Sequence, residues 1–162
     1  MEKIVDKITS YNLFNYLFPG VLFSIALEHL TPYSLTYENL IIAAFVYYFV
    51  GLIVSRFASL IVEPLLRWTR FIKFAEYDDF IIAAKEDPKI DVLLETNNMY
   101  RTFVSAIVLL VAARGYELLS YKVPFLGDYK WWILIASLLV IFLISYRKQT
   151  SYIKRRVESI KS

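Results

Sequence analysis

The chain has 162 residues, enough for one domain, and its composition is strongly apolar, with a net charge of +3. Hydrophobic residues make up 58% of it and the mean hydropathy is +0.50, whereas soluble domains hold ~45–50% apolar residues. A small water-soluble fold cannot bury so much apolar surface, which excludes an ordinary soluble domain. The absence of cysteine excludes disulfides and thiolate metal sites.

Four segments are apolar over roughly the twenty residues that a helix needs to cross a ~30 Å hydrocarbon core. They are residues 11–30, 40–62, 102–121 and 129–146. The fourth is the cleanest, because Trp131 to Tyr146 carries no charge and has aromatic residues at both ends, as interfacial belts do. The predicted fold is all-α: a four-helix transmembrane bundle with a helical cytoplasmic hairpin between spans two and three, residues 63–101, and a basic tail, residues 147–162.

The lysines and arginines predict the orientation of these spans. Two precede span one, six lie between spans two and three, and six follow span four, whereas only Lys122 and Lys130 lie in the opposite connections. The fourteen are Lys3, Lys7, Arg67, Arg70, Lys73, Lys85, Lys89, Arg101, Arg147, Lys148, Lys154, Arg155, Arg156 and Lys161. Because cytoplasmic loops carry the excess of basic residues, we expect both termini and the hairpin on the cytoplasmic side of the inner (plasma) membrane.

Span one contains a helix-breaking pair, Pro19 and Gly20, preceded by Asn12 and Asn15. One interpretation is a broken helix that lines a cavity, in which protein or water satisfies the freed backbone groups. The other is a helix that begins near Leu17, with Pro19 harmless in its first turn. The sequence favours neither.

Two polar pairs lie toward the outer ends of spans one and three: Glu28 with His29, and Arg114 with Glu117. Arg114 and Glu117 are one turn apart on the same helix face. Intramembrane charges cost ~2.5–3.5 kcal/mol even on the mildest scales. We therefore expect the four residues to satisfy one another in a cluster between the two helices; the alternative is a charged vestibule or pore lining.

Arg56 lies in span two, about five residues inward of the midpoint of that helix, or ~7–8 Å. Its long side chain can snorkel to the inner interface, or pair with Glu63, seven residues on and on roughly the same face. In a homo-oligomer, repeated copies of Arg56 could instead ring an anion-attracting constriction.

The hairpin begins at Glu63-Pro64 with an apolar face interleaved with basic residues. This pattern predicts either an amphipathic helix along the inner leaflet or a straight continuation of span two. Asp78 and Asp79 are expected to cap a following helix over residues 80–85. The residues expected to form a partner or lipid surface are Trp68, Arg67, Arg70, Lys73, Asp78 and Asp79.

A second capping signal, Asp87-Pro88, precedes residues 89–95. That helix either ends at Asn97-Asn98 or leads straight into span three. The apolar faces of the hairpin need a covering: a neighbouring subunit, the carboxy-terminal tail or a separate cytosolic protein.

Signals for chemistry are missing. With one histidine, no cysteine, no glycine-rich phosphate loop and no serine elbow, we expect neither an enzyme nor a metal site or cofactor. The basic run at residues 152–157 favours contact with anionic lipid over direct nucleic-acid binding.

Two short runs, Asn12 to Gly20 and Asn97 to Thr102, together about a tenth of the chain, resemble small bacterial membrane proteins. Some of these are similar to membrane components of anti-phage defence operons, such as the membrane subunit of Kiwa. The resemblance implies a homo-oligomeric membrane assembly that works with a cytosolic partner. Two functions follow: a non-enzymatic membrane scaffold or sensor that recruits a cytosolic protein, or a pore-forming, channel-type effector that depolarises the membrane.

Overall fold

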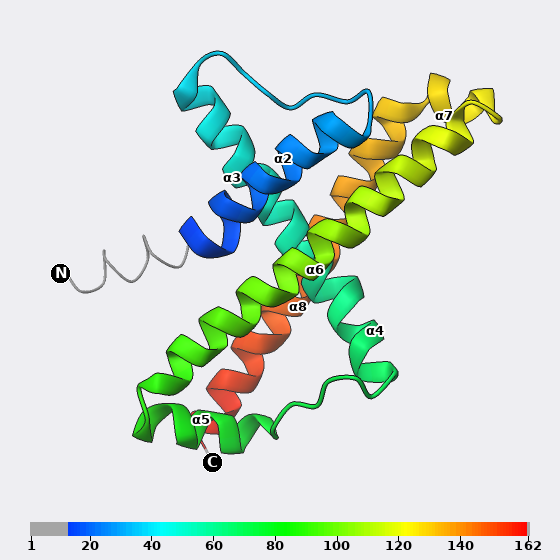
Figure 1. The fold of residues 1–162 in the computed structure, drawn as a ribbon. Coiled ribbons are helices and arrows are strands. Elements are labelled where there is room, and N and C mark those ends of the chain that lie inside the picture. Colours follow the sequence, from blue (N-terminus) through cyan, green and yellow to red (C-terminus); the bar gives the residue numbers. More distant parts are fainter. Residues whose placement is uncertain (1–12, 162) are drawn as a thin grey trace.

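A computed structural model describes residues 13–161, and in that range the chain forms helices and connections without a strand (Figure 1). Four helical segments are long and apolar enough to cross a membrane: Leu13–Leu30, Leu40–Trp68, Lys89–Ser120 and Lys130–Ser159. This confirms an all-helical chain with four potential membrane spans. Three residues used in the sequence predictions, Lys3, Lys7 and Asn12, lie outside the described residues.

Nine helical elements make up these segments and their connections in the described part of the chain. In chain order they are η1 (Leu13–Leu17, a π-helix), α2 (Phe18–Leu30), α3 (Leu40–Phe57), η2 (Ala58–Val62, a π-helix), α4 (Glu63–Trp68), α5 (Tyr77–Glu86), α6 (Lys89–Ser120), α7 (Pro124–Asp128) and α8 (Lys130–Lys161).

Three spans are longer than the sequence pattern predicted. Span two continues through α4, α6 begins before the predicted third span and passes Asn97 and Asn98 without interruption, and α8 includes nearly all of the tail. A 32-residue α-helix is ~48 Å long, ~18 Å more than the hydrocarbon core is thick. Both α6 and α8 must therefore extend well beyond the apolar layer.

Each π-helix precedes a proline by two residues: η1 precedes Pro19 and η2 precedes Pro64. Proline has no backbone N–H, and its ring clashes with the carbonyl four residues earlier. A wider turn ahead of the proline accommodates both problems and lets the helix continue. The α-helix of span one begins at Phe18 with Pro19 in its first turn, as the second interpretation has it, and the π-helix η1 extends the span ahead of it.

Spans one and two cross in direct backbone contact, and the two glycines at the crossing make this possible. A Cβ placed on Gly20 would lie 1.8 Å from the carbonyl oxygen of Tyr47, and one on Gly51 would lie 1.8 Å from that of Tyr16. One turn beyond each glycine, Ser24 and Ser55 are also buried. Small residues four apart are the usual means by which membrane helices approach closely.

Helix α6 packs against α2 and α3 through small and polar residues. Thr102 and Ser105 are fully buried, and Ala106 beside them is nearly so. The Ser105 hydroxyl donates a 3.0 Å hydrogen bond to the carbonyl oxygen of Val54 in α3. Spans one, two and three thus form one packed unit.

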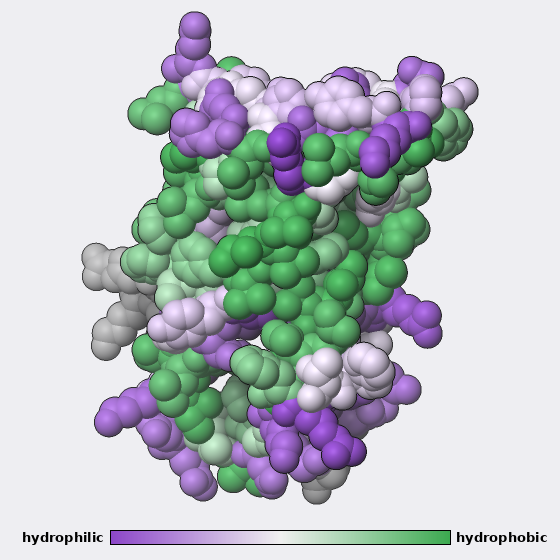
Figure 2. Space-filling view, turned by 45° about the vertical axis from the view of Figure 1, so that its right-hand side comes forward, coloured by the Kyte–Doolittle hydropathy of each residue, from purple (hydrophilic) through white to green (hydrophobic). Residues whose placement is uncertain are grey.

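Helix α8 lies at the edge of this unit. None of its side chains between Lys130 and Ser159 is buried, and its apolar contact with α3 includes the stacked rings of Phe49 and Phe142, 6.2 Å apart. Figure 2 shows the resulting surface, an apolar band between two polar ends. The connection before α3 and the helix α7 lie at one end, and α4 and α5 lie at the other (Figure 1).

Of the two alternatives for the start of the hairpin, the structure shows the continuation of span two, and this continuation is short. Helix α4 ends at Trp68, and Arg70 follows in the left-handed conformation, with φ of 60°. The N–H of Phe71 then donates to the carbonyl of Leu66, and that of Arg70 to the carbonyl of Arg67, which closes a Schellman motif. Span two therefore continues straight for six residues and stops, so that a non-helical connection leads to α5.

The predicted capping by Asp78 and Asp79 is wrong. Helix α5 starts at Tyr77, three residues before the predicted start, with Glu76 at the N-cap position and no side-chain capping bond. Both aspartates lie in the first turn instead, where negative charge complements the helix dipole. Asp87, the second predicted capping residue, does bind a backbone group at the start of the next helix. Its carboxylate accepts a 2.9 Å hydrogen bond from the N–H of Lys89, the first residue of α6.

Candidate functional site

The main polar cluster of the described residues is centred on Glu63, where η2 passes into α4. Only 9% of the Glu63 side chain is exposed. In each of the three contributing helices, the cluster lies where a long apolar segment meets the charged end of the helix. Glu63 thus marks the edge of the apolar band.

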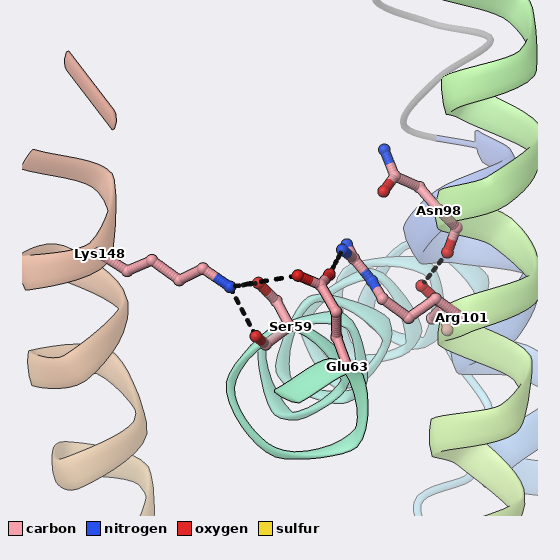
Figure 3. Close-up of polar contacts among 6 residues, drawn as sticks. Ser59, Glu63, Asn98, Arg101 and Lys148 are labelled. Carbon is pink, nitrogen blue, oxygen red and sulfur yellow. Dashed lines mark hydrogen bonds and ion pairs between the residues drawn. The ribbon is translucent and has the colours of Figure 1, made fainter. Parts of the chain in front are cut away.

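Two basic residues from different helices bind this carboxylate. Arg101 of α6 forms an ion pair with one carboxylate oxygen, and Lys148 of α8 lies with its Nζ 3.9 Å from the other. Figure 3 shows Glu63 between the guanidinium and the ammonium group. The cluster therefore joins spans two, three and four, which makes α8 more than a plain apolar anchor.

Lys148 also satisfies a backbone group that Pro64 leaves without a helical donor. In η2 the N–H of Glu63 donates to the carbonyl of Ala58, five residues back. The same register would pair the Ser59 carbonyl with residue 64, and a proline has no N–H to give. The Nζ of Lys148 donates to that carbonyl at 2.6 Å and contacts the Ser59 hydroxyl oxygen at 2.8 Å.

This arrangement can hold helices together, because one carboxylate binds cations from two other helices. The Glu63 carboxylate already contacts two cations, and Arg101 is itself only 20% exposed. Removing one partner of a buried pair costs much more than forming the pair gains, because the remaining charge stays desolvated. The cluster is therefore a strong constraint on how the three helices meet.

Arg56 does not pair with Glu63 in the described structure. Its guanidinium donates a 3.3 Å hydrogen bond to the phenolic oxygen of Tyr16 in η1. The Tyr16 ring in turn packs edge-on against Tyr48. Arg56 therefore contributes to the crossing of spans one and two, and Glu63 is available to Arg101 and Lys148.

The four outer residues separate into two groups. Arg114 and the buried Glu117 form an ion pair within α6, and the hydroxyl of Tyr121 lies 3.5 Å from the same carboxylate. Glu28 instead accepts hydrogen bonds from the hydroxyls of Ser34 and Thr36 in the connection that follows α2 (3.1 and 3.3 Å). Among the described residues no ion pair joins the two groups, and His29 is exposed. The predicted single cluster is not formed.

The connection after α2 nevertheless lies close to Glu117. Burial raises the pKa of Tyr33, and the charges of Tyr116, Glu117 and Tyr121 add to the effect. The hydroxyl of Tyr116 donates a 2.6 Å hydrogen bond to the carbonyl of Leu126. Tyrosines therefore surround the outer charged pair, where the sequence suggested Glu28 and His29.

All residues of the predicted partner or lipid surface are exposed in the single chain. Trp68 is 81% exposed, and the Arg67 guanidinium lies over the ring of Phe74 at 5.3 Å. The remaining members of that set, Arg70, Lys73, Asp78 and Asp79, are also exposed.

Two features of the site were missed in the sequence. The Gly20/Ser24 and Gly51/Ser55 pairs carried a visible signal, small residues four apart within an apolar segment. From the sequence, Glu63 is predicted as a possible partner for Arg56 and as the start of the hairpin, but not as the centre of a cluster. Its pairing with Arg101 and Lys148 depends on how three helices align, although all three residues lie at the same end of their apolar segments.

Comparison with protein-family models, with curated proteins and with solved structures finds no match to this chain. The fold and the site therefore carry the functional argument by themselves.

Proposed function

We propose that this protein is a homo-oligomeric scaffold or sensor of the bacterial inner membrane that recruits a cytosolic protein, as in the anti-phage defence assemblies that its two short runs resemble. The observation that carries the proposal is the α5–α6 arm, residues 77–100. It lies at the charged end of the spans, beyond Arg101, and exposes apolar side chains. Ile82, Val92 and Leu93 are 56%, 61% and 66% exposed.

The length of α6 supports a location of this arm outside the membrane. The helix is ~18 Å longer than the hydrocarbon core, and its first twelve residues carry charges at Lys89, Asp91 and Glu95. The basic residues of 67–101 and 147–161 belong to this same end of the molecule, which favours a cytoplasmic arm. Apolar side chains in such a place suit a protein partner.

Arg114 supports an oligomer. It lies within the third span, yet 51% of its side chain is exposed in the single chain. Lipid is a costly surrounding for a guanidinium, so a neighbouring subunit or a water-filled path is its expected environment. The second of these environments favours the alternative function, a channel-type effector in which Arg56 and Arg114 line or gate the path.

The proposal is tested by cross-linking in intact bacterial cells that carry the neighbouring genes, with Val92→Glu/Leu93→Glu as the variant. We expect one soluble protein to be cross-linked to the wild-type arm, and to be lost from the membrane fraction in the variant. The control, Ile153→Glu/Val157→Glu, changes two exposed apolar residues of α8 in the same way and should keep that protein. Equal loss in both variants would remove the arm as the recruiting surface.

Two further measurements separate the alternatives. The mass of the purified assembly in detergent should be a multiple of the 19.0 kDa chain. Dye leakage and membrane potential should not change on expression. Leakage that Arg56→Leu abolishes, in a variant still made and inserted, would replace the scaffold with the channel.

A further inference from the structure

A groove of about 620 Å³ runs between the η2–α4 segment and α8, beside the Glu63 cluster. Its walls are two facing helix stripes. On α8 the lining residues recur every three or four positions, from Ile144 through Arg147 and Ser151 to Arg155. This spacing places them on one face of the helix over a length of ~16 Å.

The groove is strongly cationic. Its lining residues carry a net charge of +3, because four basic residues, Arg67, Arg147, Lys148 and Arg155, face one carboxylate, that of Glu63. Glu63 is already bound by Arg101, and Lys148 by Ser59. No carboxylate pairs with any of the three arginines in the part of the chain that the structure describes. Three guanidinium groups are thus available to an anion.

The groove is also amphipathic along its length. Leu60 and Ile144 lie at the end where α8 is still apolar, and Ile144 is 49% exposed. The arginines begin at Arg147, immediately after the charge-free stretch that ends at Tyr146. The cations therefore lie where the headgroups of a bilayer meet its hydrocarbon, and apolar side chains continue from them into the apolar band.

We propose that this groove binds the phosphate headgroup of an anionic phospholipid, with an acyl chain along Leu60 and Ile144. Guanidinium groups bind phosphate through paired hydrogen bonds, and basic pockets between membrane helices are a known setting for anionic headgroups. The apolar wall favours a lipid over free phosphate, because free phosphate has no apolar part that could contact it. The lipid would add a contact between α8 and α4 beyond the pair of Lys148 with Glu63. This proposal is independent of partner recruitment by the α5–α6 arm.

The test measures the association of spin-labelled phosphatidylglycerol, relative to spin-labelled phosphatidylcholine, with the full chain in phosphatidylcholine bilayers. We expect the wild type to prefer phosphatidylglycerol by about fivefold or more, the equivalent of one basic contact at a membrane surface. In Arg147→Gln/Arg155→Gln the preference should fall close to one. Arg147→Lys/Arg155→Lys keeps both charges and should retain most of it.

The matched control is Lys154→Gln/Arg156→Gln, which removes the same charge from the same helix, outside the groove lining. It should keep the preference. An equal loss in the two glutamine variants would mean diffuse attraction to a basic helix and would overturn the groove as a site. So would a wild type without any preference.

Two further experiments address a variant that fails to insert and binding of free phosphate. If Arg147→Gln/Arg155→Gln does not insert, the single variant Arg67→Gln on the opposite wall should lower the preference, and an unchanged value would overturn the proposal. Displacement of labelled phosphatidylglycerol by inorganic phosphate, but not by chloride at equal ionic strength, would assign the groove to free phosphate and reject the lipid.

Discussion

Helix α3 is packed in opposite ways on its two sides. Toward α2 it presents Gly51 and Ser55, and the backbones are in direct contact. Toward α8 it presents Phe49, and the contact is made by large side chains. Farther along, Lys148 of α8 adds a hydrogen bond to Ser59 of η2. Close backbone approach fixes one geometry, because any added atom clashes. Side chains that meet at an exposed edge fix the position of α8 less tightly than backbone contact would, and a groove remains beside it.

The largest expected effect is at the glycine crossing. Gly20→Ala and Gly51→Ala would each place a Cβ 1.8 Å from a backbone carbonyl oxygen, so the helices must separate. Overpacking of this kind costs about 3 kcal/mol or more when backbone has to move. Thermal unfolding in detergent, followed by the loss of the monodisperse species, measures it.

Gly115→Ala is the matched control, because a Cβ there meets nothing within 4 Å. Alanine is the better helix former by about 0.5–1 kcal/mol, so this variant should be unchanged or slightly more stable. If all three alanine variants melt alike, the close crossing of α2 and α3 is not what holds the unit together.

The second largest effect is expected at the Glu63 cluster, which joins spans two, three and four. Glu63→Gln leaves Arg101, only 20% exposed, without its carboxylate, and should destabilise the fold by about 3 kcal/mol. Glu158→Gln removes a carboxylate from the exposed pair with Lys154 and should change stability by less than about 1 kcal/mol. A Glu63→Gln variant as stable as Glu158→Gln would show that the Glu63 cluster does not hold the three helices together.

The smallest effect separates the two sides of α3 directly. Lys148→Met removes the donor to the Ser59 carbonyl, which should cost about 1–2 kcal/mol and loosen α8 alone. The chain has no cysteine, so spin labels can be placed at exposed Phe45 and Leu139 for the α3–α8 distance and at Ile25 with Phe45 for the α2–α3 distance.

The α3–α8 distance distribution should broaden in Lys148→Met while the α2–α3 distribution stays unchanged. Lys154→Met, on the exposed pair, should alter neither. Broadening of both distributions would show that α8 is coupled to the whole unit rather than docked at its edge.

Much of this architecture was predictable from local patterns. Span positions follow from hydropathy, because a run of ~20 apolar residues has few other stable solutions. The ends were predicted less well. Asn97 and Asn98 are compatible with a helix end, yet α6 continues through them into the buried Thr102, whose hydroxyl donates a hydrogen bond to the Asn98 carbonyl. Asp78 and Asp79 are good capping residues by type, but the helix starts at Tyr77, before both of them.

The sequence by itself determined that this chain is helical, that four segments are long and apolar enough to span a membrane, and that fourteen of its eighteen basic residues flank the spans on one side. These are properties of composition and periodicity along the chain. Only the tertiary structure decided that Arg56 binds Tyr16, that Glu63 joins Arg101 and Lys148, and that Glu28 and Arg114 remain apart. The reason is physical: the partners come from different helices, and the glycine crossing and the π turns before Pro19 and Pro64 set how those helices align.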